Sequence, residues 1–190
     1  MQDTAVRPTI QDLAGTWTID ASHSMVEFTA KHMMISTVRG RFDELEGTIT
    51  IDPDLSRSSA HVSIKAGSIS TNNPDRDAHL RSPDFLEVEA HPELSFEATG
   101  VDLISAEDGT FRLQGDLTVR GVRAPITLDG RFEGFVSADL WGKRRAAFSA
   151  STSINRKDFG LTWNRALETG GVLVSDRVGI ELQVSAIKAE

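Results

Sequence analysis

The sequence contains no cysteine, and aromatic residues make up 6% of its 190 residues. Without cysteine, the protein has no disulfide bonds, no thiol chemistry and no cysteine–zinc site. No stretch approaches the roughly 20 consecutive apolar residues that a membrane-spanning helix requires. The N-terminal stretch MQDTAVRPTIQDLAG also lacks the apolar core of a secretory signal. We therefore expect a cytoplasmic protein with no membrane span.

Basic residues are in the minority, with 20 Lys and Arg against 28 Asp and Glu, which gives a formal net charge of −8. Binding to nucleic acid depends on an excess of Lys and Arg facing the phosphates. The overall charge therefore favours solubility and disfavours nucleic acid as a partner. The one dense basic stretch, GKRRA at residues 142–146, is interpreted as a solvated turn.

Alternation of apolar and polar residues is the dominant pattern along the chain. In SMVEFTAKH, for example, Val26, Phe28 and Ala30 share one face while charged and polar residues occupy the other. This period of two is typical of antiparallel strands with one apolar face. Gly- and Asp-rich turn signals separate the alternating runs. The pattern predicts eight strands, at residues 25–31, 37–52, 60–69, 93–104, 111–119, 124–135, 145–154 and 177–187.

The segment 37–52 would span about 50 Å if extended, well beyond the usual strand of roughly 17–20 Å. Its apolar residues change from even positions, such as Phe42, to odd ones, such as Leu45. A β-bulge near residues 43–46 would reconcile the two halves. Long bent strands, and the need to remove sheet edges, indicate an elongated eight-stranded antiparallel barrel. We predict an all-β fold in a single domain over residues 1–190.

One or two short helices are predicted outside the strands. The first 14 residues are flexible or contain one helical turn, in TIQDLAG. A second helical segment covers residues 75–86. There, Asp75 or Asp77 is a candidate N-cap, and Ser82, which precedes a proline, is a candidate start for a further turn.

The predicted inner faces mix phenylalanine with small residues, as with Phe28 beside Ala30 and Phe96 beside Ala98. Small residues leave space inside a barrel, but large and small side chains also interdigitate in a filled core. Eight-stranded barrels occur in both forms. On the residues alone, a hollow interior and a packed structural or stress-related domain without cargo stay open.

Motifs that would indicate catalysis are missing. The five histidines form no metal-binding pattern such as H-E-x-x-H, no G-x-S-x-G elbow occurs, and no glycine-rich loop opens a helix. The strongest candidate for chemistry is His79, working with Asp77 or Asp158 on a small apolar substrate. The simpler alternative is that His79 forms a structural hydrogen bond.

Successive blocks of the sequence resemble the YceI-like proteins. TWTIDASHSMVEFTAKH, VRGRFDELEGTITID, LQGDLTVRGVRAPITLDGRFEG and FSASTSINRKDFGLTWN follow the family's order, between about residues 17 and 186. The resemblance implies an elongated, lipocalin-like barrel that holds a long isoprenoid chain, quinone-like or another polyprenyl compound, often as a homodimer. It implies a non-enzymatic protein that carries, stores or sequesters this lipid, with no further cofactor and no metal. It favours a tunnel over a packed interior.

The resemblance also implies which residues contact the lipid. His79 and Arg81 are candidate headgroup contacts; alternatively Arg81 pairs with Asp77 and His79 caps a carbonyl. Phe159 and Trp163 line or close the tunnel mouth, or Phe159 belongs to the core of a turn. The predicted tunnel lining is Val26, Phe28, Phe42, Ile64, Leu80, Phe85, Leu86, Phe96, Leu117, Phe132, Phe148, Phe159 and Trp163.

Overall fold

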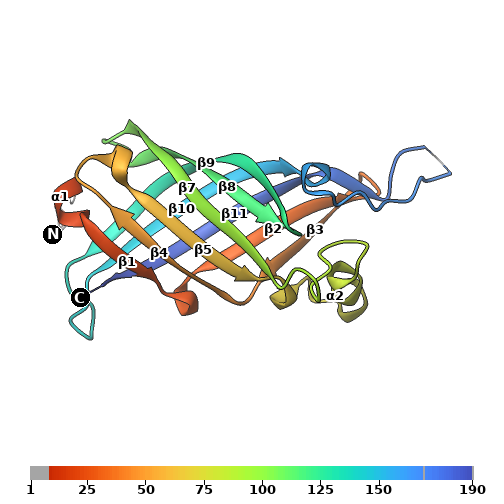
Figure 1. The fold of residues 1–190 in the computed structure, drawn as a ribbon, viewed down its shortest axis with the longest axis horizontal. Helices are drawn as coiled ribbons and strands as arrows, with labels where there is room; N and C mark the ends of the chain where they lie inside the picture. The colour runs from red at the N-terminus through yellow and green to blue at the C-terminus, as the bar shows by residue number, and fades with distance from the viewer. Residues whose placement is uncertain (1–8, 169, 190) are drawn as a thin grey trace.

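A computed structural model describes residues 9–168 and 170–189, which wind into an elongated β-barrel (Figure 1). Nothing in this part of the chain forms a helix with the length and apolar character needed to cross a membrane. The first part of the predicted flexible segment, residues 1–8, lies outside the described residues.

The described residues form eleven strands and six short helical segments. The strands are β1 Gly15–Ile19, β2 Met25–His32, β3 Ser36–Phe42, β4 Leu45–Ile51, β5 Ser59–Lys65, β6 Ile69–Ser70, β7 Glu93–Ser105, β8 Thr110–Val119, β9 Val122–Val136, β10 Arg145–Asn155 and β11 Val174–Lys188. The helices are α1 Ile10–Leu13 and α2 Pro74–Arg81, with 3₁₀ turns η1 Ala21–His23, η2 Leu55–Arg57, η3 Ala66–Ser68 and η4 Arg156–Phe159.

Eight of the described strands close into an antiparallel ring. Their order is β1-β4-β5-β7-β8-β9-β10-β11, and β1 pairs back onto β11 through residues 17–19. The remaining three continue the wall beyond this ring: β2 follows β1, β3 precedes β4 and β6 follows β5 along the chain. Three sections of the wall therefore consist of two consecutive strands each. The predicted eight-stranded antiparallel barrel is confirmed, although β1 was missed.

The prediction of one strand over residues 37–52 was wrong. The strand is interrupted at Asp43 and Glu44. On either side of this interruption, β3 and β4 have different partner strands. Phe42 pairs with Ile69 of β6, whereas Leu45 pairs with Ile64 of β5. The change of apolar parity therefore marks a change of partner strand, and not a bulge within one ladder.

The barrel has two structurally different ends (Figure 1). At the α1 end lie α1, η2, and the turns that join β7 to β8 and β9 to β10. At the α2 end lie α2, the β2–β3 turn and the long connection from β10 to β11. These two names are kept below.

Both predicted helical segments contain a helix, but α2 differs from the prediction. Its N-cap is Asn73, whose side chain accepts from the Arg76 N–H, and neither predicted acid caps it. The helix ends at Arg81, and Ser82 is its C-cap instead of the start of a further turn. Pro74 at the first helical position supplies the fixed φ that the start of a helix needs.

The α1 end is fastened by contacts between distant segments. The buried Trp17 donates from Nε1 to the Leu13 carbonyl at 2.7 Å, which holds α1 against the barrel. Arg145, at the start of β10, donates to Asp20 at 2.6 Å and to Asp139 at 2.8 Å. These two ion pairs connect Asp20, the N-cap of η1, to the β9–β10 turn.

Replacing Asp20 with Asn tests this connection. Hydrogen bonds from Ser22 and Arg145 hold the pKa of the Asp20 carboxyl well below its usual 3.8. A carboxyl with a depressed folded pKa stabilises the fold above its unfolded pKa and loses that contribution as the pH falls below it. We expect Asp20→Asn to lower the free energy of unfolding by about 2 kcal/mol at neutral pH, measured by denaturant titration.

The difference between Asp20→Asn and the parent protein should shrink progressively below about pH 4. Glu107→Gln, which removes an exposed carboxylate in the β7–β8 turn, is the control and should change stability by less than about 0.5 kcal/mol. A difference for Asp20→Asn that stays constant down to strongly acidic pH would contradict the role given to this carboxylate.

Candidate ligand cavity

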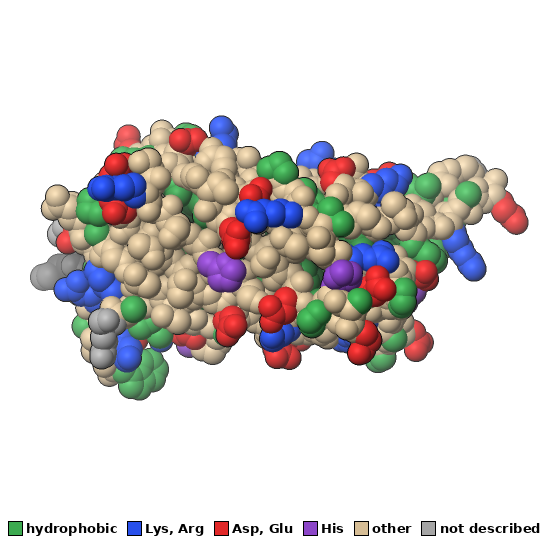
Figure 2. All heavy atoms as spheres, in the orientation of Figure 1, with side chains coloured by type: hydrophobic (Ala, Val, Ile, Leu, Met, Phe, Trp, Pro, Cys, Tyr) green, Lys and Arg blue, Asp and Glu red, His purple; other side chains and the backbone are tan. Residues whose placement is uncertain are grey.

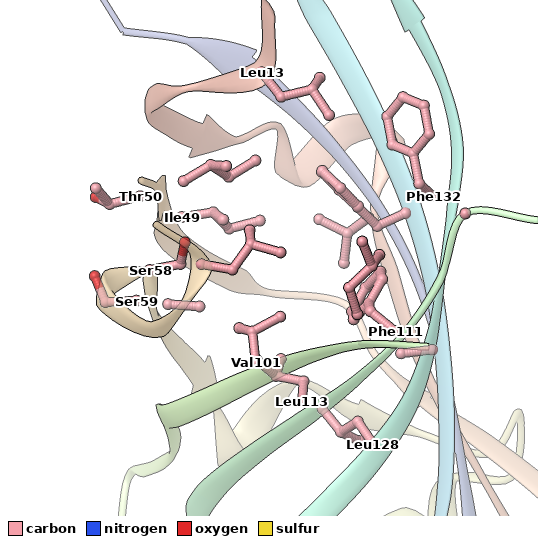
Figure 3. Close-up of a pocket in the computed structure, with 18 of the residues that line it drawn as sticks. Leu13, Ile49, Thr50, Ser58, Ser59, Val101, Phe111, Leu113, Leu128 and Phe132 are labelled. Atoms are coloured by element: carbon pink, nitrogen blue, oxygen red, sulfur yellow. The ribbon is translucent and has the colours of Figure 1, made fainter. Parts of the chain in front are cut away.

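The interior of the barrel contains two cavities, of about 350 and 220 Å³. Cavity 1, the larger, lies toward the α1 end and is lined by Leu13 of α1 together with strand residues (Figure 3). Cavity 2 extends toward the α2 end, where Leu80, Phe85 and Leu86 line it. The two adjoin in the middle of the barrel, because both are lined by Ile19, Val62, Phe96, Leu128, Leu182 and Val184.

The cavity walls are almost entirely apolar. Figure 3 shows Leu13, Phe111 and Phe132 facing cavity 1, whereas Thr50 and Ser59 turn away from it. Among the described residues, those with polar side chains around cavity 1 are Thr9, Thr50, Ser58, Ser59 and Ser149, and none is charged. Around cavity 2 they are Ser24, Glu27, Arg156 and Gln183. Such walls offer a ligand apolar burial and few hydrogen bonds.

Glycines in the wall make room for phenylalanine rings. Phe111 lies over Gly130, its cross-strand partner on β9, and a Cβ at Gly130 would overlap the ring. Phe28 and its partner Gly40 repeat the arrangement on β2 and β3. On β7 and β8, the Phe96 ring lies diagonally over Gly115, whose own partner is Ala98. Pairing a ring with a cross-strand glycine covers the glycine backbone. It also keeps each ring against the wall, so that the space at the centre stays open.

Buried side chains pack at the α2 end of the interior. Phe85 and Leu86 are 7% exposed, and Phe159 of η4 is 1% exposed. Beside them lies Arg156, whose side chain is 3% exposed and which lines cavity 2. This part of the barrel is therefore packed around the buried guanidinium of Arg156.

The hydrogen bonds of Arg156 explain how its charge is kept inside the fold. Its guanidinium donates to the backbone carbonyls of Ser175, Leu161 and Trp163 at 2.6–3.0 Å, and lies 3.3 Å from Asp176. Burial lowers the pKa of Arg156, and the Asp176 carboxylate opposes that change. The contacts tie the β10–β11 connection to the barrel and satisfy the charge that water would otherwise solvate.

The two predicted headgroup contacts are both engaged within the protein. Arg81 donates to the carbonyls of Gly67 at 2.8 Å and Ile69 at 2.6 Å, so the alternative pairing with Asp77 was wrong. His79 Nε2 lies 2.9 Å from Asp84, and its ring packs edge-on against Phe85 and Trp163. A role for His79 and Arg81 at a headgroup stays a prediction, although neither appears in the cavity walls.

The proposed catalytic pairing of His79 with Asp77 does not form. The buried Asp77 carboxylate accepts hydrogen bonds from the Thr71 N–H and hydroxyl. Asp158 is exposed on η4. Over the described residues, no group of three or more His, Asp or Glu side chains is placed to hold a metal ion. The polar groups at the α2 end therefore hold α2 and η4 to the neighbouring segments of the barrel.

Most of the predicted lining residues do face a cavity. Phe132 and Phe148 line cavity 1, and Phe96 lines both cavities. Phe159 is buried in the core and Trp163 packs edge-on against His79; neither is in a cavity wall. The others, all in the wall of cavity 2, are Val26, Phe28, Phe42, Ile64, Leu80, Phe85, Leu86 and Leu117. Contact of these residues with a bound lipid stays a prediction.

Several lining residues were missed. Leu13 and Ile19 belong to α1 and β1, which are too short to show a clear period in the sequence. Phe111, Leu113 and Leu128 alternate with the expected period, and that signal was sufficient to place them inside.

A closed antiparallel barrel around an apolar cavity is the architecture of lipocalin-like ligand-binding proteins. The family model for the YceI-like domain matches residues 17–186. The chain therefore belongs to the YceI-like family, which confirms the resemblance noted in the sequence. The UPF0312 protein of Staphylococcus aureus (strain N315) is 35% identical over 166 residues, covering 87% of this chain and 93% of that protein.

Solved structures share the fold over most of the chain. The YCEI protein of Campylobacter jejuni has a TM-score of 0.71 and 30% identity, with 84% of this chain and 90% of that one covered. BcnA of Burkholderia cenocepacia has a TM-score of 0.74 and 18% identity, covering 88% and 98%. A polyisoprenoid-binding domain from Saccharophagus degradans has a TM-score of 0.64 and 16% identity, covering 91% and 98%.

The pairing of Phe111 with Gly130 gives a stability prediction. Gly130→Ala places a methyl group where the Phe111 ring lies, and the ring must move into cavity 1. We expect a loss of about 1–3 kcal/mol in the free energy of unfolding, the usual effect of overpacking, measured by denaturant titration.

Gly134→Ala is the matched control on the same strand, because nothing lies within 4 Å of a Cβ there. Its effect should stay within about 0.5 kcal/mol. Combining Gly130→Ala with Phe111→Leu should recover part of the loss, since the obstructing ring is gone. Equal stability of the two alanine variants would show that the ring does not depend on the glycine.

Proposed function

We propose that this protein binds a long isoprenoid lipid, quinone-like or another polyprenyl compound, in the interior of its barrel. The observation that carries the proposal is a pair of adjoining apolar cavities that run along the barrel. Membership of the YceI-like family and the likeness to a polyisoprenoid-binding domain support it. The proposed role is to carry, store or sequester the lipid, without catalysis.

The apolar walls suit a long, thin ligand without polar groups along its length. Burial of apolar surface is favourable by roughly 25 cal/mol per Å², and that gain needs no precise pattern of polar groups. Cavity 1 falls in the range of roughly 300–1,000 Å³ found for small-molecule sites, and cavity 2 extends it. An isoprenoid chain is apolar along its length and narrow enough to follow adjoining cavities.

The alternatives fare differently against the same observations. A fully packed interior does not agree with cavities of this size. An enzyme built on His79 lacks its proposed Asp77 partner, since that carboxylate is bonded to Thr71. A homodimer and a cytoplasmic location stay predictions, to be checked by analytical ultracentrifugation and by cell fractionation.

Filling the interior should prevent binding. Ala150 lines cavity 1 on β10, so Ala150→Phe adds a ring where the chain of the lipid would lie. We expect the lipid recovered by solvent extraction and mass spectrometry to fall at least about tenfold per mole of protein, because the buried apolar surface of the ligand is lost. Circular dichroism should show an intact sheet.

Ser151→Phe is the matched control, since Ser151 is the next residue of β10 and is exposed on the outer face. It should retain the parent protein's lipid content. The proposal fails if the parent protein is reproducibly empty after purification from cells and takes up no added polyprenyl lipid from detergent.

A further inference from the structure

The turn between β9 and β10, residues 137–144, presents two large apolar side chains to solvent. Leu140 is 94% exposed and Trp141 is 73% exposed. Figure 2 shows hydrophobic and basic side chains side by side at the lower left, where Figure 1 places this turn. Burial of a tryptophan gives one of the largest hydrophobic gains of any residue. Holding both side chains in water therefore needs an explanation.

The turn is held in a defined shape. Asp139 accepts hydrogen bonds from the N–H groups of Trp141 at 2.8 Å and Lys143 at 2.9 Å, and receives Arg145 Nε on its other oxygen. Gly142 adopts a φ of +76°, which glycine reaches without strain. These contacts fix the backbone of the turn in a shape that exposes the side chains of Leu140 and Trp141 to solvent.

After Gly142, the apolar tip is followed by two exposed basic residues, Lys143 and Arg144. Asp139 pairs with Arg145, while the Asp12 carboxylate of α1 acts on both Arg144 and Lys188. The four cations Lys143, Arg144, Arg145 and Lys188 outnumber the three acids Asp12, Asp20 and Asp139. Arg145 itself is shared between Asp20 and Asp139. A local positive charge therefore adjoins the apolar tip, on a protein whose formal net charge is −8.

The turn lies beside the α1-end boundary of cavity 1. The Arg144 carbonyl accepts from the Lys188 N–H, and Lys188 Nζ donates to the Ala14 carbonyl beside α1. Leu13 of α1 lines cavity 1, and so do the exposed residues Thr9, Leu103 and Ala106 of the same end. At the α2 end, the buried side chains of Phe85 and Leu86 line cavity 2 instead. The turn is thus at the end of the barrel that holds the larger cavity.

We propose that the β9–β10 turn is a membrane-contact site that docks the α1 end on an anionic lipid bilayer. Leu140 and Trp141 enter the interfacial region, where the amphipathic indole is favoured, while Lys143 and Arg144 meet lipid phosphates. The occupant is a lipid surface because the apolar tip matches the boundary of the acyl chains and the adjacent cations match the anionic headgroups. The inference goes beyond the proposed cargo, and it brings cavity 1 to the compartment that holds apolar lipids.

Co-sedimentation with unilamellar vesicles tests the site. The parent protein should bind phosphatidylcholine vesicles containing phosphatidylglycerol, bind pure phosphatidylcholine more weakly, and be released by high salt. Replacing Leu140 and Trp141 together by Ser should weaken binding at least about tenfold. Replacing Lys143 and Arg144 by Gln should weaken it roughly tenfold on the anionic vesicles.

The matched control is the β2–β3 turn at the opposite end, whose Met34 and Ile35 are 55% and 82% exposed. Replacing these two residues by Ser removes similar apolar surface and should leave vesicle binding unchanged. Trp141 supplies a direct readout, since Trp17 is fully buried and Trp163 packs against His79 and Phe85 at the opposite end. Vesicles should shift the tryptophan emission to the blue, brominated lipids should quench it, and Trp141→Phe should abolish both effects.

Three results would overturn the inference. The first is equal vesicle binding by the parent protein and the Leu140/Trp141 variant. The second is loss of binding only in the Met34/Ile35 variant. The third is a self-association that the Leu140/Trp141 variant abolishes, with no vesicle binding by the parent, which would make the turn an interface between copies of this chain. Vesicle binding is measured independently of cargo, so an empty barrel that docks, or a loaded one that does not, separates this inference from the proposed function.

Discussion

The hollow interior depends on a strand of five residues. Strand β1 pairs with β4 on one side and, through residues 17–19, with β11 on the other. Without it, the sheet would have two open edges and its apolar inner face would meet water. The fully buried Trp17 and the charge of Lys188 above its ring hold this short strand in place. Few residues thus decide whether the sheet is closed.

Length and an open bore are obtained by two further devices. Strand β11 pairs with β2 through its first part and with β1 through its last residues, so the wall extends beyond the closed ring. The cross-strand glycines then hold phenylalanine rings against that wall. Without such glycines, rings of this size would meet at the centre of an eight-stranded barrel, whose interior is just wide enough for side chains to fill it.

Alternation predicted most of the strands and most of the inner face, because a period of two is a local property that survives in any antiparallel sheet. Partner choice is not local. Phe42 and Leu45 are three residues apart, yet they pair with different strands, and only the parity change hinted at this. Strand β1 is too short for periodicity to mark it.

The polar contacts of the α2 end were the least predictable part of the site. His79 pairs with Asp84, which follows the end of α2, and Arg81 bonds to the carbonyls of Gly67 and Ile69. Neither arrangement follows from helical spacing, since each depends on where a loop passes the helix. The residue types indicated that these side chains would form hydrogen bonds. Their partners depended on the fold.

Walls that carry so little hydrogen-bonding information also limit how selective the barrel can be. A site made of aliphatic and aromatic groups separates two ligands by their girth and length, and a single methylene changes the binding free energy by only about 0.8 kcal/mol. Under the proposed function, occupancy is then governed by supply. The same chain produced in a foreign host would fill with that organism's most abundant slender lipid, and its contents would record the producing cell as much as the native partner.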